Sequence, residues 1–335
     1  MILSICIPNY NRPDKLERLL KSIDSNNTED VEIVISDDHS PKANEIKIVV
    51  DKFKQNCPYK LIYSENEKNL GYDKNLKAGA LKASGDWILY MGNDDLFVPG
   101  AIDKLIQFTE SNNDLGYILR SHYFTDKNNK TETFYYYNDT KFFEPGVSSY
   151  VQMFRKSVFI SGFTIKREYI LPLLKDDFDG TLLFQLYLVA EVCLKYRSAY
   201  FNEPLTQRYD EGSPEFGNAP SEKGLYTPGS VTLDHQLNFM RGYFKITKYL
   251  DEKYKINSTP LVKADMSKYL YHGLATQRDK GISVFLKYVK GLNSIGYNCT
   301  MYYYIYVFLL IILGKKICDS GIRIIKKILG STPRL

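Results

Sequence analysis

Cysteine is scarce in this chain of 335 residues, and its five copies follow no pattern. Their number is odd, they are widely scattered, and no C-x-x-C pair or zinc-ligand spacing occurs. Disulfide frameworks and structural zinc sites both need regularly spaced cysteines, so neither is expected here. The cysteine pattern therefore predicts a protein of a reducing compartment.

Several functional signatures are also missing. The four histidines form no H-E-x-x-H pattern, so we expect surface or core residues rather than metal ligands. No G-x-G-x-x-G follows the first predicted strand, and no G-x-x-x-x-G-K-S/T loop occurs. These absences disfavour the dinucleotide-binding fold and a P-loop nucleotide hydrolase. The N-terminus starts directly with a strand pattern, so no signal peptide is expected.

An excess of charge is absent from most of the chain. With 44% hydrophobic and 25% charged residues, the composition is typical of a globular protein with a large core. The net charge of +5 arises in the C-terminal tail, where Asp319 is the single acid after Leu313. The basic residues of the tail are Lys315, Lys316, Arg323, Lys326, Lys327 and Arg334. Because the remainder is balanced in charge, we expect no nucleic-acid-binding surface.

What is present is a regular alternation of strand and helix patterns in the N-terminal third. Apolar runs typical of buried strands cover residues 2–7, 31–35, 60–63 and 87–91. Patterns with helical spacing follow at 13–23, 46–53, 74–83 and 101–109. This alternation predicts an α/β fold with a mainly parallel central sheet that helices cover on both faces.

Polar side chains follow three of the predicted strands, at the edge where ligands bind in open α/β sheets. They are Tyr10, Asn11 and Arg12, then Asp37 and Asp38, and finally Asn93, Asp94 and Asp95. A nucleotide could stack on Tyr10, donate a base N–H group to Asp37 and present its diphosphate to Mg²⁺ or Mn²⁺ held by Asp94. The alternative for the last group is a solvated Asn-Asp-Asp turn.

Four motifs in this order resemble the nucleotide-binding half of a family 2 glycosyltransferase of the GT-A fold, of the bacterial polysaccharide or O-antigen type. They are residues 4–12, residues 34–40, Asn69-Leu70-Gly71 with Asn75, Ala83, Gly85 and Asp86, and Gly92-Asn93-Asp94-Asp95 with Pro99. The resemblance covers residues 1–210 and is strongest at the start. It implies nucleotide-sugar-binding roles for Pro8, Tyr10, Asn11, Arg12, Asp37, Asp38, Asn69, Gly71, Asn75, Asn93, Asp94 and Asp95.

The sequence departs from this family at the D-x-D motif. Gly92 stands where the family has its first aspartate, which leaves Asp94 as the metal-binding member. One carboxylate, the donor diphosphate and water can still hold Mg²⁺ or Mn²⁺, because Mg²⁺ usually binds proteins through one or two carboxylates. We therefore expect a divalent metal at Asp94.

The resemblance also implies a catalytic aspartate at the start of a helix predicted over 181–195. Counting back from Gln185 places Asp179 on the family's catalytic base and Phe178 on the glutamate that precedes it. Because that glutamate is missing, Asp177 is a rival for the base. The structural alternative is an acidic cluster that stabilises a helix N-terminus by its charge alone.

Residues 207–228 are rich in Gly, Pro, Asp, Glu and Ser and are predicted to form a loop. Similar enzymes have a segment here that closes over the donor, with a basic or imidazole group facing the diphosphate. Arg208 is the candidate for that group, and an ordinary surface arginine is the alternative.

The C-terminal part resembles no family. Helices are predicted over 231–254, 261–278 and 282–292, and an almost purely apolar run covers 301–313. A helix of thirteen residues spans about 20 Å, which is less than the about 30 Å of a hydrocarbon layer. Tyrosines at one end of the run and lysines at the other suit a bilayer interface. A buried core helix or a dimer interface is the alternative.

These observations predict an inverting glycosyltransferase of cell-surface polysaccharide synthesis, such as O-antigen or capsule. The predicted organisation is a GT-A domain at 1–228 (nucleotide-binding half 1–100, acceptor-side half and lid loop 101–228), a helical region at 229–298 and membrane-associating amphipathic helices at 299–335. The expected partners are a nucleotide-sugar, a glycan acceptor linked to polyprenyl diphosphate, and an anionic membrane surface at the cytoplasmic face of the inner membrane. A homo-oligomer is compatible with this reading.

Two rival readings remain open. A catalytically inactive nucleotide-sugar-binding or scaffold protein of the same fold is compatible with the departures at Gly92 and Phe178. A nucleotidyltransferase also needs acids and a metal, but it normally has a Gly-rich basic loop after the first strand, which this chain lacks. The identity of the sugar, base and linkage does not follow from the sequence.

Overall fold

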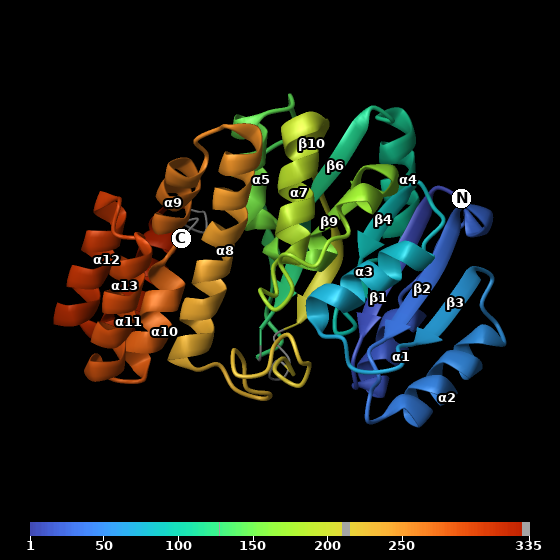
Figure 1. The fold of residues 1–335 in the computed structure, drawn as a ribbon, viewed down its shortest axis with the longest axis horizontal. Coiled ribbons are helices and arrows are strands. Elements are labelled where there is room, and N and C mark those ends of the chain that lie inside the picture. The colour runs from blue at the N-terminus through green and yellow to red at the C-terminus, as the bar shows by residue number, and fades with distance from the viewer. Residues whose placement is uncertain (127, 210–214, 330–335) are drawn as a thin grey trace. The chain divides into compact units, whose positions relative to one another are not determined.

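The computed structural model describes residues 1–126, 128–209 and 215–329. The chain divides into two compact units, Met1–Ser230 and Val231–Leu335 (Figure 1). The first unit contains the sheet and all four motifs, and the second is helical in its described residues.

The first unit is built on a ten-stranded sheet. Its central path runs β3-β2-β1-β4-β9-β6-β10-β5, with β7 paired to β6 and β8 paired to β10. The strands are β1 (Leu3–Asn9), β2 (Val31–Asp37), β3 (Lys60–Glu65), β4 (Trp87–Tyr90), β5 (Leu96–Phe97), β6 (Leu115–Thr125), β7 (Thr131–Phe134), β8 (Lys141–Phe143), β9 (Phe163–Lys166) and β10 (Arg197–Tyr209).

Strand direction determines which loops share an edge of this sheet. β1 is parallel to β2 and β4, β2 is parallel to β3, and β6 is parallel to β10. β9 is antiparallel to both β4 and β6, so those two strands run the same way. The carboxyl ends of β1, β2, β4, β6 and β10 therefore lie at one edge, and the predicted α/β fold with a mainly parallel sheet is confirmed.

Helices follow the strands of the first unit as the alternation predicts (Figure 1). They are α1 (Pro13–Lys21), α2 (Ala43–Lys54), α3 (Tyr72–Lys82), α4 (Ala101–Ser111), α5 (Val147–Phe154), α6 (Arg167–Ile170) and α7 (Phe184–Lys195), with 3-10 turns at Thr28–Asp30, Arg155–Val158, Ile160–Gly162 and Leu171–Leu173. Pro13 begins α1, where its missing N–H group costs no helical hydrogen bond.

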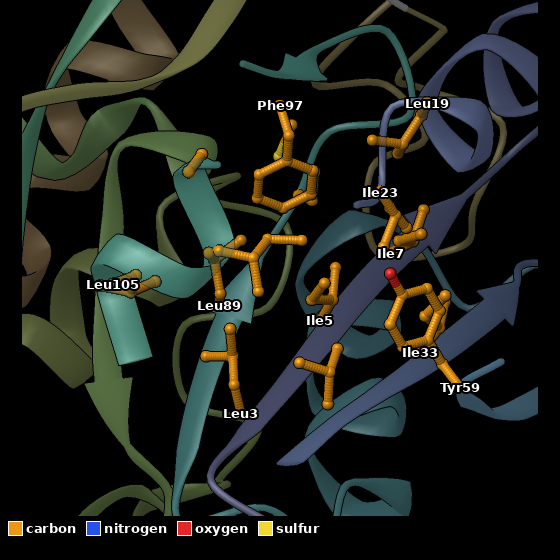
Figure 2. Close-up of a cluster of buried hydrophobic side chains, with 14 of the residues drawn as sticks. Leu3, Ile5, Ile7, Leu19, Ile23, Ile33, Tyr59, Leu89, Phe97 and Leu105 are labelled. Carbon is orange, nitrogen blue, oxygen red and sulfur yellow. The ribbon is translucent and has the colours of Figure 1, made fainter. Parts of the chain in front are cut away.

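Period-two alternation along β1 divides its side chains between two layers. Ile5 and Ile7 point into a fully buried cluster with Leu19 of α1 and Ile33 of β2 (Figure 2). Cys6 points to the opposite face, where its Sγ lies 3.8 Å from the carbonyl oxygen of Gly79 in α3. Helices thus pack against both faces of the sheet at β1.

Two elements of the first unit differ from the sequence prediction. β10 extends from Arg197 to Tyr209, so the expected loop at 207–228 is wrong for its first residues. α7 begins at Phe184 rather than at 181, because Gly180 and Leu182 adopt left-handed φ values of 80° and 59°. The Asp73 carboxylate also accepts the backbone N–H groups of Leu182 and Phe184 at 2.9 and 3.0 Å, which holds this non-helical entry in place.

The second unit contains helices α8 (Leu233–Tyr254), α9 (Thr259–Ser267), α10 (Tyr271–Asp279), α11 (Ile282–Ile295), α12 (Met301–Ile312) and α13 (Gly314–Leu329). The single helix predicted over 261–278 is wrong, because the helical structure is interrupted between α9 and α10. At this break the Ser267 hydroxyl donates to the Tyr297 carbonyl at 2.8 Å. Within the described residues, no helix combines the length and hydrophobicity that crossing a bilayer requires.

Helix α12 is half exposed. Its Tyr303 and Leu310 are buried within the second unit, whereas Met301, Phe308 and Ile312 are 77%, 63% and 64% exposed. The predicted apolar segment is therefore a helix with one packed side and one apolar side that no described residue covers.

Candidate functional site

The loops after β1, β2 and β4 are joined by a chain of side-chain hydrogen bonds. Asn93 Nδ2 donates to Asn9 Oδ1 at 2.8 Å, and Asn9 Nδ2 donates to Asp37 Oδ1 at 2.8 Å. Asp37 also accepts from the hydroxyl and the backbone N–H of Ser40, at 2.6 and 3.0 Å. Because Asp37 is fully buried and both its oxygens are used, this geometry makes it a residue that fixes the loops.

Asp38 performs a similar task for the third motif. Its carboxylate accepts the backbone N–H groups of Leu70 and Gly71, each at 2.8 Å, and the amide of Asn66 at 2.9 Å. Burial raises the pKa of Asp38, and these three donors oppose that rise. Asn69 supports the same turn, since its Oδ1 accepts the Gly71 N–H group at 3.1 Å.

Two further predicted residues lie at this edge in structural positions. Asn75 of α3 is buried and donates to the Ser36 carbonyl at 3.0 Å, which ties the helix to the end of β2. Pro8 pairs in register with Ser36 near the end of β1. Tyr10 is partly exposed, and burial raises its pKa. The structure thus brings the predicted nucleotide-binding residues together at one edge of the sheet.

Arg12 and Asp94 form the charged centre of this edge. Arg12 Nη1 donates to Asp94 Oδ2 at 3.0 Å, and the Asp94 side chain is 29% exposed. Asn11 and Arg12 both adopt left-handed φ values, 55° and 60°, which non-glycine residues rarely do. Backbone strain of this kind clusters at functional sites.

Asp95, the next residue of the loop, has a different environment from Asp94. It is buried and accepts the Ser161 hydroxyl, while Ser161 Oγ accepts the Gly92 N–H group at 2.9 Å. Burial, and then the charge of Asp94, raises the pKa of Asp95 to about 8. A Cβ atom at Gly92 would lie 2.9 Å from Asp95 Oδ2, so the family's first aspartate would fit here only if the Asp95 carboxylate moved.

Few side chains at this edge of the sheet could coordinate a metal ion. Among the residues that the structure describes, no three His, Cys, Asp or Glu side chains gather in a metal-binding group. Asp94 is the partly exposed carboxylate of the loop, and one of its oxygens is engaged by Arg12. The residues therefore fit a divalent metal only if the remaining ligands are donor phosphate oxygens and water.

The described part of the predicted lid, residues 215–228, packs against the site. Glu215 accepts from Asn11 Nδ2 at 2.7 Å and lies 3.4 Å from Arg12 Nε. Asn218 Nδ2 lies 3.4 Å from the Tyr10 hydroxyl. These contacts engage three residues of the first motif, so this segment covers the predicted donor edge. Residues 210–214 of the predicted loop lie outside the described residues.

Two glycines make room for this segment. A Cβ atom at Gly71 would lie 2.8 Å from Glu222 Oε1, and one at Gly180 would lie 2.2 Å from the Ser221 carbonyl oxygen. Glu222 also accepts the backbone N–H groups of Tyr72 and Gly217, each at 2.7 Å. The third motif and the loop before α7 therefore both contact residues 217–222.

Asp179 lies in the turn before α7 and is held by lysines of α3. Its Oδ1 accepts from Lys77 Nζ at 2.7 Å, and its Oδ2 lies 3.4 Å from Lys74 Nζ. Asp176 binds the same two lysines, whereas the side chain of Asp177 is exposed. Sequence reasoning missed these lysines, although their i, i+3 spacing on one helix was a usable signal.

Arg208 lies on β10 rather than in a loop. Its guanidinium lies over the rings of Phe124 and Phe159, 5.5 and 5.8 Å from their centroids. Its charge lowers the pKa of Asp95, opposing the rise caused by burial, so it lies within electrostatic reach of the β4 loop. Sequence reasoning found Arg208 but missed its aromatic neighbours.

A family model and several curated proteins match the N-terminal part of the chain. Residues 4–163 match the family model described as Glycosyl transferase family 2. Abequosyltransferase RfbV of Salmonella typhimurium is 38% identical over 119 residues, which are 34% of this chain and 34% of that protein. The GalNAc(5)-diNAcBac-PP-undecaprenol beta-1,3-glucosyltransferase of Campylobacter jejuni is 34% identical over 106 residues, 31% of this chain and 33% of that protein. The chain thus matches about a third of the length of these relatives.

Two solved structures share the fold. S. aureus TarS 1-349 in complex with UDP-GlcNAc has a TM-score of 0.59 at 14% identity, covering 88% of this chain and 80% of that one. The mannosyltransferase PcManGT from Pyrobaculum calidifontis, in complex with GDP-Man and Mn2+, has a TM-score of 0.51 at 11% identity, covering 95% and 83%. At these identities the likeness is one of fold.

Proposed function

Because residues 4–163 belong to glycosyl transferase family 2, we propose that this chain transfers one sugar from a nucleotide-sugar to a hydroxyl group of a glycan, with inversion. The observation that carries the proposal is the chain of side-chain hydrogen bonds Asn93–Asn9–Asp37, which joins the loops after β4, β1 and β2 at one edge of the sheet. Ligands of open α/β sheets bind at this edge.

The residues of the edge have distinct roles in the proposed reaction. Tyr10 is partly exposed and can stack on a nucleotide base, while Asp37, Asp38 and Asn75 hold the surrounding loops. Arg12 lies beside Asp94 and carries a positive charge toward the position proposed for the diphosphate. Asp94 would hold Mg²⁺ or Mn²⁺, whose chemistry is to stabilise the negative charge of the departing diphosphate.

Proton transfer is assigned to the turn before α7. Asp179 takes the proton of the acceptor hydroxyl as that oxygen attacks the anomeric carbon and the bond to the diphosphate breaks. A single in-line displacement of this kind inverts the anomeric configuration. Two lysines compete for the Asp179 carboxylate, and Asp177 is exposed, so Asp177 is the alternative base.

The acceptor and location are proposed from the second unit and from one relative. α12 exposes an apolar and aromatic side, and Lys315, Lys316 and Arg323 follow it in α13. Apolar side chains next to cations suit an anionic membrane surface. The printed name of the Campylobacter relative includes a PP-undecaprenol-linked glycan. We therefore place the enzyme on the cytoplasmic face of the inner membrane, acting on a polyprenyl-diphosphate-linked glycan of O-antigen or capsule synthesis.

A panel of nucleotide-sugars tests this function. The melting temperature of the full chain is measured with each compound, with and without Mn²⁺, and release of nucleotide is followed for those that bind. Stabilisation by a nucleotide-sugar, with slow hydrolysis to free nucleotide, supports the enzyme. Binding without any turnover, even with glycan acceptors, would favour the rival reading of a catalytically inactive binding protein.

A further inference from the structure

A cationic and aromatic surface lies beside the Asp94–Asp95 loop, on the side away from the nucleotide motifs. We call it the Arg208 surface: its exposed or partly exposed members are Phe124, Phe134, Phe159 and Arg208, and its buried members are Arg120 and His122. In β6 and β10, His122 pairs with Thr206 and Phe124 with Arg208. Residues two apart on a strand share a face of the sheet, so these side chains lie on one face.

Ser161 connects this surface to the candidate site. Its carbonyl accepts from Arg120 Nη2 at 2.8 Å and from the Thr206 hydroxyl at 3.1 Å. Its own hydroxyl donates to Asp95. In strand order, β6 and β10 follow β4 on one side, whereas β1 and β2 follow it on the other. A donor bound at the β1–β2 loops would therefore leave the Arg208 surface for the second substrate.

The two arginines form no ion pair with an acidic side chain of the described residues, although Arg208 lies within electrostatic reach of Asp95. Arg120 is fully buried, and its partners are the Thr164 hydroxyl and the Ser161 carbonyl. Arg208 is exposed and rests on two aromatic rings. Within residues 1–126, 128–209 and 215–329, no carboxylate pairs with either guanidinium. An arginine held by aromatic faces keeps its hydrogen-bond donors available, which favours recognition of an anionic group.

The pKa of the histidine in this surface is affected by the positive charge of both arginines. His122 is 5% exposed, and its Nδ1 has no hydrogen-bond partner in the part of the chain that the structure describes. Its ring stacks on Phe134 at 5.0 Å and lies 4.6 Å from Phe159. Burial, and then the charges of Arg208 and Arg120, lowers the pKa of His122 to about 3.

The aromatic members provide a platform for a sugar ring. Phe134 is 42% exposed on β7, a short strand whose residues are all exposed, and Phe159 is partly exposed. Exposed aromatic side chains grouped in this way mark binding surfaces. Aromatic rings beside a guanidinium that forms no ion pair in the described residues suit a ligand that has both an apolar sugar face and an anion.

We propose that the Arg208 surface binds the acceptor, with Arg208 contacting a phosphate group attached to the acceptor sugar and Phe134 and Phe159 contacting the sugar ring. The inference rests on the proposed glycosyl transfer. The donor diphosphate and the acceptor phosphate are both phosphate esters, so Arg208 could in principle contact either one. The proposal assigns Arg208 to the acceptor.

Calorimetry with glucose 1-phosphate as the probe tests this assignment, using methyl glucoside as the uncharged control. Both are titrated into the full chain saturated with the nucleoside diphosphate that the donor panel identifies. Arg208→Gln is expected to weaken glucose 1-phosphate binding by about tenfold or more, the scale of one charge-assisted hydrogen bond. Phe159→Ala is expected to weaken both glucose compounds.

Arg197→Gln is the matched control. Arg197 also lies on β10 and over an aromatic ring, 5.8 Å from the Phe142 centroid, but Asp114 and Glu144 pair with it. This variant should bind glucose 1-phosphate as the unchanged chain does. Circular dichroism melts of all variants show whether each is folded before binding is compared.

The outcomes separate the two phosphate sources and the two proposals. Loss of nucleotide-diphosphate affinity in Arg208→Gln, equal to its loss of glucose 1-phosphate affinity, would overturn the assignment in favour of the donor. Equal binding by Arg208→Gln and Arg197→Gln would overturn the site itself. In contrast, an unchanged chain that binds no nucleotide-sugar would defeat the proposed function.

A rise in the pKa of His122 on adding glucose 1-phosphate, measured by NMR, supports the inference, because an anion stabilises the imidazolium.

Discussion

Arg12 binds Asp94 directly, with 3.0 Å between Nη1 and Oδ2, although 82 positions separate them in the sequence. The pair connects the loop after β1 to the loop after β4. A divalent metal and Arg12 would share the Asp94 carboxylate, so metal binding and donor binding are expected to depend on one another.

Asp94→Asn should abolish transfer while leaving the melting temperature nearly unchanged. The side chain is partly exposed, and its ion pair with Arg12 is not buried, so it contributes little to stability. Activity and thermal melts measure the two effects. Asp51→Asn, which removes an exposed acid of α2 paired with Lys47, is the control. Full activity of the Asp94 variant, or of the unchanged chain in excess EDTA, would remove the metal from the mechanism.

Glu215→Gln should tighten binding of a nucleoside diphosphate by severalfold. The Glu215 carboxylate engages Asn11 and Arg12, where the proposed donor phosphates would bind, and like charges repel. Calorimetry with the nucleotide found in the donor panel measures the change. Weaker binding by this variant would show instead that Glu215 holds the segment in a conformation that the donor requires.

Asp179→Asn should lower turnover by about 10²-fold or more with donor affinity preserved, the usual scale for a general base. Asp177→Asn should be mild. Asp176→Asn is the matched control, because Asp176 pairs with the same two lysines and has no proposed role in proton transfer. If the Asp177 variant were the inactive one, the role of base would pass to that residue.

Stability should fall as pH rises, in part through Asp73. Burial raises the pKa of Asp73 from 3.8 to about 7, and the Phe184 and Leu182 N–H groups partly oppose the rise. Between these values the unfolded chain releases a proton that the folded chain keeps, so the free energy of unfolding falls by at most about 1.4 kcal/mol per pH unit. Above pH 7 this contribution levels off. Urea unfolding of Asp73→Asn should show a shallower fall between pH 4 and 7, and identical slopes would contradict the assignment.

The exposed side of α12 should bind anionic vesicles. Replacing Phe308 and Ile312 together with serine in the full chain removes apolar area that is 63% and 64% exposed, so co-sedimentation with phosphatidylglycerol vesicles should drop several-fold. Ile48→Ser removes an apolar side chain of α2 that is 69% exposed and should leave binding unchanged. High salt should also weaken vesicle binding by the unchanged chain, because salt screens the attraction between Lys315 and Lys316 and the anionic lipid. Equal sedimentation of all variants would indicate that α12 is an interface between proteins.

Residue patterns along the chain were enough to predict the alternation of strands and helices and the position of the polar motifs after β1, β2 and β4. Both follow from local patterns, because a strand of Val31–Asp37 and a helix that begins at Pro13 depend on residue spacing and backbone preference. The same local signals carry the resemblance to the family whose model matches residues 4–163.

Contacts among segments that are distant in the chain could not be predicted in this way and became visible in the folded structure. Lys77 meets Asp179, residues 217–222 pack against Gly71 and Gly180, and β10 carries Arg208 over Phe159. Local propensity predicted a loop at Arg208, but pairing with β6 makes this residue part of a strand. Local propensity also predicted a longer α7, but hydrogen bonds to the Asp73 carboxylate hold the residues before Phe184 in a non-helical conformation. The physical reason is that burial and hydrogen-bond satisfaction depend on which elements the sheet order makes neighbours, and spacing along the chain does not encode that order.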